Sequence, residues 1–194
     1  MACIHTVGHS NHPIDAFVRL LTNAGVDLVV DVRTVPHSRR FPQFSKKALE
    51  RALADAGIGY RWMGDTLGGL KHRSDSATFE QVAATQGFAD ALDTLVALAQ
   101  TRVPAIMCAE REPMDCHRTI LVGRYLRERD VTLRHILADG TVESNADFEA
   151  RLVRKTRVTG GTVGGLFDEA DPAGDPVRAA YAERAARMAR DAAR

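Results

Sequence analysis

Cys108, Cys116 and His117 stand within one short stretch of the chain, and Glu110 lies between the two cysteines. A thiol beside an imidazole can lose its proton and act as a nucleophile, and a carboxylate can carry a proton. Arg118 follows directly, and its forked guanidinium is suited to a phosphate or a carboxylate. We therefore predict that both cysteines and Glu110 are catalytic, and that His117 and Arg118 bind substrate.

Groups of the same kind occur in two stretches nearer the N-terminus, His9-Ser10 and Asp31-Val32-Arg33. His9 is a candidate general base that Asp31 would orient, and we count both as catalytic. Ser10 and Arg33 are predicted to bind substrate. A purely structural ion pair between Asp31 and Arg33 is the alternative role for these two side chains.

A basic loop places Arg39 and Arg40 next to Phe41, with Phe44 and Trp62 as further aromatic residues that could lie nearby. Cations mixed with aromatic rings are typical of sites for single-stranded nucleic acid, where the bases stack on the rings. A solvated loop is the simpler interpretation, and we favour it. Because either guanidinium can bind an anion, we assign Arg39 and Arg40 to the substrate-binding set.

Short β-rich runs that alternate with helical patterns must position these residues, and this alternation predicts an α/β fold. Between the runs, apolar residues recur with helical spacing. The sequence therefore predicts a Rossmann-like, open, mostly parallel five-stranded sheet with helices on both faces. The five predicted strands are Ile4–Val7, Leu28–Val30, Tyr60–Met63, Pro104–Met107 and Thr132–Ile136.

The first, second and fourth predicted strands each end in chemically capable residues, namely His9, Asp31 and Cys108. In a parallel sheet all these ends lie at one edge, and ligands bind there at the point where the strand order reverses. We therefore expect the three strand ends to share one pocket. A helix start predicted at Cys116, with Asp115 as its N-cap, would add backbone N–H groups that favour an anion and lower the pKa of a thiol.

The chain divides by composition into three parts. Residues 1–157 are predicted to form a single α/β domain. Residues 158–176, rich in Gly, Asp and Pro, are predicted to be a flexible linker. Residues 177–194 are an Ala/Arg-rich helical tail with few large apolar groups, expected to be solvated or frayed.

The overall charge and the cysteine content exclude several classes of protein. The net charge is +1, from 26 basic and 25 acidic residues, so the whole molecule has no strong field for nucleic acid or membranes. Three cysteines do not form a disulfide framework. The first residues lack the pattern of a signal peptide, and no apolar run could span a bilayer. We therefore expect a cytoplasmic protein with free thiols and no membrane association.

Four separate runs in the chain carry a resemblance to a known family. The chain resembles the domain of unknown function 488 family over about residues 3–155. This resemblance implies a compact α/β domain, but it implies no particular activity, because the family has none that is settled. The runs are Thr6-Val7-Gly8-His9-Ser10, Asp31-Val32-Arg33 with Pro36-His37-Ser38, Leu67-Gly68-Gly69, and Met107-Cys108-Ala109-Glu110 with Cys116-His117-Arg118.

Our first hypothesis is an enzyme, a thiol- or His/Asp-dependent transferase or hydrolase, that acts on a phosphorylated or nucleotide-like substrate. The first alternative is a non-catalytic module that binds nucleic acid or a nucleotide in DNA or RNA maintenance. The second is a regulatory site in which Cys108, Cys116 and His117 bind a metal, with His9 as a fourth ligand. Their spacing is not a standard zinc spacing, and the arginines would repel a cation. We therefore predict no metal ligand and no cofactor, and an anionic small molecule or nucleotide as the partner.

Overall fold

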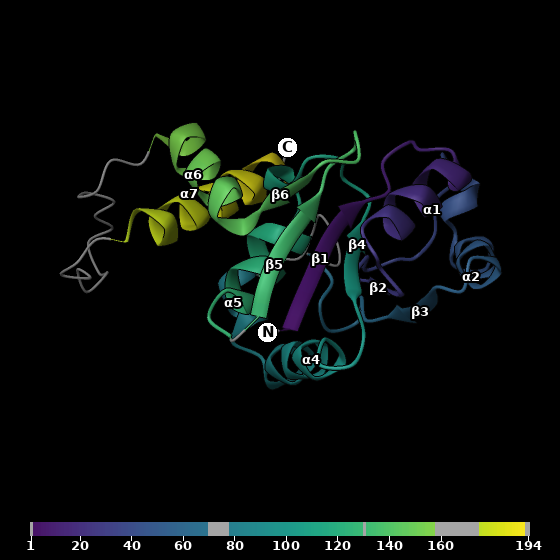
Figure 1. Cartoon of the computed structure of the whole chain (residues 1–194). Coiled ribbons are helices and arrows are strands. Elements are labelled where there is room, and N and C mark those ends of the chain that lie inside the picture. The colour runs from purple at the N-terminus through teal and green to yellow at the C-terminus, as the bar shows by residue number, and fades with distance from the viewer. Residues whose placement is uncertain (1, 70–77, 130, 158–174, 193–194) are drawn as a thin grey trace.

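A single six-stranded sheet forms the centre of the chain in a computed structural model, which describes residues 2–69, 78–129, 131–157 and 175–192 (Figure 1). The strand order is β3-β2-β4-β1-β5-β6, and every neighbouring pair is parallel except β5 and β6. The predicted mostly parallel α/β sheet is confirmed. The strands are β1 (Ala2–Gly8), β2 (Leu28–Asp31), β3 (Gly59–Trp62), β4 (Pro104–Cys108), β5 (Val131–Ile136) and β6 (Val142–Ser144).

The predicted number of five strands is wrong, because β6 adds an antiparallel edge strand. β6 is only three residues long and follows a turn at Gly140, which has a positive φ. Its apolar residue, Val142, is exposed rather than buried. A strand this short and this poor in buried apolar residues leaves no periodic pattern in the sequence.

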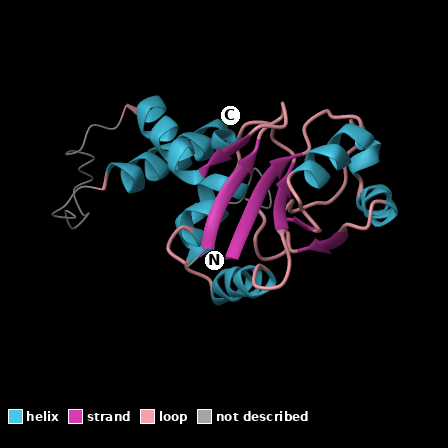
Figure 2. Cartoon of the chain, viewed as in Figure 1, coloured by secondary structure: helices cyan, strands magenta, loops and turns pink. Residues whose placement is uncertain are grey.

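Helices cover both faces of the sheet, as predicted (Figure 2). Neighbouring residues of β2 show this, since Val29 packs with the cluster that includes α1 and α2, and Val30 packs with the cluster that includes α4 and α5. None of the helices in the described part of the chain combines the length and the apolar character of a membrane span. The helices are α1 (Ile14–Asn23), α2 (Lys46–Asp55), α3 (Phe79–Ala83), α4 (Gln86–Leu98), α5 (Arg124–Leu126), α6 (Asn145–Thr156) and α7 (Pro176–Ala192), with a π-helix η3 (Arg118–Gly123) directly before α5.

The strand order reverses between β1 and β4, which are neighbours in the sheet. The chain leaves β1 through α1 toward β2, and it leaves β4 through η3 and α5 toward β5, in the opposite direction. The usual Rossmann order places β1 beside β2, whereas here β4 separates them, so the Rossmann-like topology is not confirmed. The reversal still places a crevice above the carboxyl ends of β1 and β4, where the sequence predicts the site.

Helix α7 packs against α6 instead of being solvated, which corrects our expectation for the tail. Ala180 and Tyr181 are fully buried, and the Tyr181 hydroxyl donates to Glu149 of α6 at 3.3 Å. The buried face of α7 consists of the ring of Tyr181 and several small alanine side chains. This face buries apolar area, but it is not apolar enough to be recognised in the sequence as one side of an amphipathic helix. Residues 158–174 of the predicted linker lie outside the described residues, so the division into domain and linker stays a prediction.

Candidate functional site

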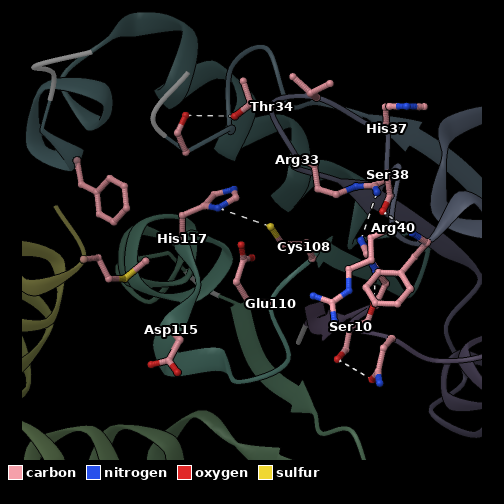
Figure 3. Close-up of a pocket in the computed structure, with 18 residues that line it drawn as sticks. Ser10, Arg33, Thr34, His37, Ser38, Arg40, Cys108, Glu110, Asp115 and His117 are labelled. Carbon is pink, nitrogen blue, oxygen red and sulfur yellow. Dashed lines mark hydrogen bonds between the residues drawn. The ribbon is translucent and has the colours of Figure 1, made fainter. Parts of the chain in front are cut away.

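A cavity of about 820 Å³ opens at the carboxyl ends of β1, β2 and β4 (Figure 3). Most of the predicted site residues line it, although they come from distant parts of the sequence. Asp31, Arg39, Cys116 and Arg118 do not line it. The predicted residues in the cavity wall are His9, Ser10, Arg33, Arg40, Cys108, Glu110 and His117.

Four side chains in and behind one wall, Cys108, Glu110, Cys116 and His117, form what we call the thiol cluster. Their sulfur, oxygen and nitrogen atoms all lie within 4.8 Å of one another. Cys108 Sγ is 3.6 Å from His117 Nδ1, and Cys116 Sγ is 2.9 Å from Glu110 Oε2. The predicted proximity of the two cysteines, the histidine and the carboxylate is therefore present in the fold.

β4 ends at Cys108, and the residues directly after it, which include Glu110, pass close to the end of the neighbouring strand β1. Gly8 pairs with Cys108 in the sheet, and the backbone pairing continues one residue further, where His9 N–H donates to the Cys108 carbonyl at 2.9 Å. A Cβ atom on Gly8 would overlap the carbonyl oxygen of Glu110. Glycine at this position therefore allows the close approach that fixes Glu110 at the cavity.

Cys116, not Asp115, caps the following helix, so the predicted N-cap is wrong. Cys116 has extended backbone angles, its carbonyl accepts from Thr119 N–H, and its Sγ accepts from Arg118 N–H at 3.4 Å. Asp115 lies in the preceding 3-10 turn, and its carboxylate pairs with Arg184 of α7 at 2.6 Å. The thiol of Cys116 is thus held in place by the start of the helix that it caps.

The orientation of His117 is fixed by the backbone after β2. Its Nε2–H donates to the carbonyl of Val32 at 3.0 Å, which leaves Nδ1 with a lone pair that faces Cys108 Sγ. Gly69 lies against the ring, because a Cβ on Gly69 would be 3.1 Å from Cγ of His117. The loop that ends at Gly69 therefore packs against the imidazole and limits its movement.

The surroundings shift the pKa values of the groups in the thiol cluster in different directions. Burial, together with the neighbouring Cys116 sulfur, raises the pKa of Cys108 well above its usual value. Burial alone would raise the pKa of Cys116 too, but the hydrogen bond from Cys108 and the positive charge of Arg118 act in the opposite direction, and that pKa is lowered. Burial and the Cys116 charge raise the pKa of Glu110. Of the two cysteines, Cys116 is therefore the one whose surroundings favour the thiolate.

Asp31, Arg33 and His9 form a buried chain of contacts beside the thiol cluster. Arg33 binds Asp31 with two hydrogen bonds, Nη2 to Oδ2 at 2.6 Å and Nε to Oδ1 at 2.9 Å. Tyr60 also donates to Asp31, at 2.8 Å. Arg33 Nη1 lies 3.3 Å from His9 Nε2. The ion pair left open as an alternative is present, and the prediction that Asp31 orients His9 directly is wrong, because Arg33 stands between them.

His9 is neutral, and both of its ring nitrogens are occupied. Nδ1–H donates to the carbonyl of Ser10 at 2.9 Å, Nε2 faces Arg33, and the ring stacks on Phe44 at 4.2 Å. Burial and the charge of Arg33 lower the pKa of His9 to about 4. Ser10 adopts a left-handed conformation with φ 47°, a rare conformation for a residue with a side chain. His9 therefore serves here as a rigid wall, and its predicted role as a general base has no support from this geometry.

Arg118 is fully buried, and its guanidinium donates to the backbone carbonyls of Glu110 and Arg111. It has no carboxylate partner in the described ranges, and its Nε has no hydrogen-bond partner there. Because the helix starts at His117, after the Cys116 cap, the Arg118 side chain turns inward and away from the cavity. The structure contradicts the predicted substrate clamp; Arg118 instead holds the backbone that carries Glu110.

Arg40 lines the cavity, with its guanidinium 5.4 Å from the centre of the Phe41 ring, whereas exposed Arg39 does not line it. Phe44 is fully buried against His9 and offers no face to a nucleic-acid base. The loop therefore supplies one cation and one ring to the cavity. Binding of nucleic acid stays a prediction.

Sequence reasoning missed several parts of the cavity wall. His37 and Ser38 line it, and their only signal in the sequence was membership of one of the runs that carry the family resemblance. Asp115, which we expected only to cap a helix, also lines it. Met188 of α7 lines it as well, and no sequence signal could have found a residue in a tail expected to be solvated.

A family model described as Domain of unknown function DUF488 matches residues 13–125. The matched range contains Asp31, Arg33, Arg118 and the whole thiol cluster, but it is shorter at both ends than the resemblance inferred from the motifs and stops short of His9 and α7. Searches of curated proteins and of solved structures found no match. Because the family match covers more than half of the sequence, the chain belongs to the Domain of unknown function DUF488 family.

Proposed function

We propose that this protein is an enzyme that transfers or hydrolyses a group on a small anionic molecule, such as a phosphorylated or nucleotide-like compound. The observation that carries the proposal is the composition of the cavity walls (Figure 3). Cys108, Glu110 and His117 point toward one another on one side, and Ser10 and Arg40 lie on the other side. A reactive wall thus faces a wall that can bind an anion.

The size and charge of the cavity support a small anionic ligand. A volume of about 820 Å³ lies within the range of pockets for small molecules, which is roughly 300–1,000 Å³. Arg40 has no ion pair in the part of the chain that the structure describes, so its charge is available to a ligand. Glu110 and Asp115 at the other end disfavour a second anion there. We therefore place the anionic group near Arg40 and the reacting part of the substrate near Glu110.

The groups that can exchange protons with a molecule in the cavity are on the thiol-cluster wall. His9 and Asp31 are engaged by Arg33, so the proton chemistry first predicted for them passes to Glu110 and His117. The three cysteines are free thiols. We accordingly propose a reducing compartment, the cytoplasm, as the place where the protein works.

Calorimetric titration of the full chain with inorganic phosphate, ribose 5-phosphate and AMP tests the anion site. We expect at least one of the phosphate esters to bind, and Arg40→Ala to weaken its affinity at least tenfold. Arg39→Ala is the matched control, because Arg39 is a neighbouring exposed arginine outside the cavity wall. If neither ester binds, or if both variants lose affinity equally, the proposed anion site is wrong.

A second readout separates an enzyme from a binding module. Mass spectrometry of the bound ester after incubation should show a changed product with wild-type protein and none with Glu110→Gln. Retention of an oligonucleotide that falls steeply with salt and is unaffected by Glu110→Gln would instead favour a nucleic-acid-binding module.

A further inference from the structure

We propose that the thiol cluster is a binding site for one divalent transition-metal ion, zinc by preference. Cys108, Cys116, His117 and Glu110 would be its ligands. The inference deepens the proposed function, because such an ion would be the reactive group of the cavity wall. The binding itself does not depend on which substrate occupies the cavity.

The donor atoms lie close to the positions that a tetrahedral zinc ion requires, and small movements of the side chains would complete the geometry. Zinc–sulfur and zinc–nitrogen bonds of about 2.3 and 2.0 Å place a sulfur and a nitrogen ligand roughly 3.5 Å apart. Cys108 Sγ and His117 Nδ1 are 3.6 Å apart, and all four donor atoms lie within 4.8 Å of one another. Cys116 Sγ and Glu110 Oε2, at 2.9 Å, share a hydrogen bond and would separate by some tenths of an ångström when an ion replaces its proton.

The groups behind the donor atoms are arranged as they are around protein-bound metals. His117 donates its Nε2–H to the carbonyl of Val32, which fixes the tautomer and leaves Nδ1 free to coordinate. The sulfur of Cys116 accepts the backbone N–H of Arg118, a contact that stabilises a thiolate. Gly69 packs against the imidazole, so the ring has little freedom to turn away.

The charge of the surroundings also favours a bound cation with thiolate ligands. Two thiolates, one carboxylate and one divalent ion carry a net charge of −1. Arg118 beside them is a fully buried cation that has no carboxylate partner within the described ranges. A buried cation of this kind is costly unless it is compensated by a nearby anion. One arginine therefore balances the loaded site, whereas the sequence had suggested that arginines would repel the metal.

The site has a closed side and an open side. Cys116 is fully buried, whereas Cys108, Glu110 and His117 line the cavity, and Glu110 is the exposed member of the set. Structural zinc sites are closed on all sides, and catalytic sites keep one exchangeable position. Glu110 occupies that position here, so a water molecule or a phosphate oxygen could replace its carboxylate at the ion.

Zinc titration of the full-length, chelator-treated protein tests the inference, with a chromophoric chelator as competitor. We expect one zinc ion per chain, and a loss of affinity of at least tenfold in each of Cys108→Ser, Cys116→Ser and His117→Ala. Cys3→Ser is the matched control: Cys3 also lies near a histidine, with Sγ 3.8 Å from His5 Nε2, but outside the cluster, so its affinity should be unchanged. Cobalt in place of zinc should give the thiolate charge-transfer absorption of a tetrahedral site.

Circular dichroism of each variant separates loss of ligands from loss of fold, and Glu110→Gln, at the exposed position, should keep the fold and bind zinc more weakly. The inference is overturned if the folded wild type binds zinc no more tightly than Cys108→Ser, or if Cys108 and Cys116 form a disulfide in protein purified without oxidant. Absence of zinc binding would leave the phosphate-ester calorimetry unchanged. Conversely, absence of ester binding would leave one zinc ion per chain, so the two proposals fail separately.

Discussion

The guanidinium of Arg33 lies between the carboxylate of Asp31 and the imidazole of His9 and contacts both. It makes two hydrogen bonds to Asp31, and its Nη1 lies 3.3 Å from His9 Nε2. His9 in turn stacks on Phe44 and donates a hydrogen bond to the carbonyl of Ser10. The buried ion pair between Asp31 and Arg33 therefore helps to fix the part of the cavity wall that His9 and Ser10 form. Any change to Asp31 therefore reaches the cavity through Arg33.

Replacing Asp31 by Asn should destabilise the protein strongly, because it leaves Arg33 buried without its counter-charge. Breaking a buried pair in this way costs about 3 kcal/mol or more in the free energy of unfolding. Asp15→Asn is the control, since the Asp15–Arg19 pair is exposed, with side chains 66% and 65% accessible, and its loss should change the free energy of unfolding far less. Urea unfolding followed by circular dichroism measures both; similar losses in the two variants would argue against a buried pair.

Gly8→Ala should destabilise the sheet and disturb the thiol cluster together. The new methyl group overlaps the Glu110 carbonyl, so the end of β4 must move, at a cost of roughly 1–3 kcal/mol for overpacking. Gly87→Ala is the control. Gly87 lies in helix α4, and a Cβ there would meet only the methyl group of Thr66, at 3.8 Å. Thermal unfolding should show a lower midpoint for the first variant alone. An unchanged midpoint for Gly8→Ala would mean that the backbone of Glu110 does not pass this close to Gly8.

The free energy of unfolding should fall as the pH drops from 6.5 toward 4. Burial lowers the pKa of His135 to about 4, and His9 behaves alike. Between this pKa and the unfolded value near 6.5, the unfolded chain binds more protons, so stability rises with pH across this window. Each histidine should contribute about 2 kcal/mol between pH 7 and pH 5.

His135→Gln isolates one of these two histidines. His135 is fully buried, with Nδ1 2.9 Å from the Thr6 hydroxyl and Nε2 3.2 Å from Asn145 Oδ1. The variant should have a lower free energy of unfolding than wild type at pH 7. Its free energy of unfolding should also depend less on pH, because one of the two titrating histidines is gone. Urea titrations at pH 5, 6 and 7 give the slope, and a slope equal to that of wild type would show that His135 does not titrate in this range.

Tyr181→Ala should release α7 from α6 while the sheet stays folded. The Tyr181 ring is fully buried beside Phe148, and truncation of a buried aromatic side chain costs about 3–5 kcal/mol, enough to undock a single helix. Trypsin should then cut faster at the arginines of α7 than it does in wild type. Arg190→Ala, at an exposed position, is the control that should leave the cleavage rate of the remaining sites unchanged. Equal rates in Tyr181→Ala and wild type would show that the tyrosine does not anchor the helix.

The meeting of distant residues at one sheet edge was predictable, because strand direction in a parallel sheet follows from the alternation of strands and helices. His9, Arg33 and Cys108 follow three apolar runs, and this placement alone brings them to one cavity. What the sequence could not give was the direction of each side chain. Arg118 turns into the core because the helix begins one residue later than expected, at a cap formed by Cys116.

The sequence also could not show which charged side chains form ion pairs with each other. The sequence offered Asp31 two partners, and the fold shows that Arg33 binds it and separates it from His9. Asp115, expected to cap a helix, pairs instead with Arg184, which lies many residues later in α7. Such long-range pairs depend on packing that leaves no local pattern.

The cavity wall is built partly from chain that the family model does not cover. The DUF488 match ends at residue 125, yet Met188 lines the cavity and Arg184 holds Asp115, which also lines it. Relatives that share every strand-end motif can therefore differ in ligand preference through this region alone. A compound screen performed on one relative would then transfer to another only when the C-terminal helix is compared as well.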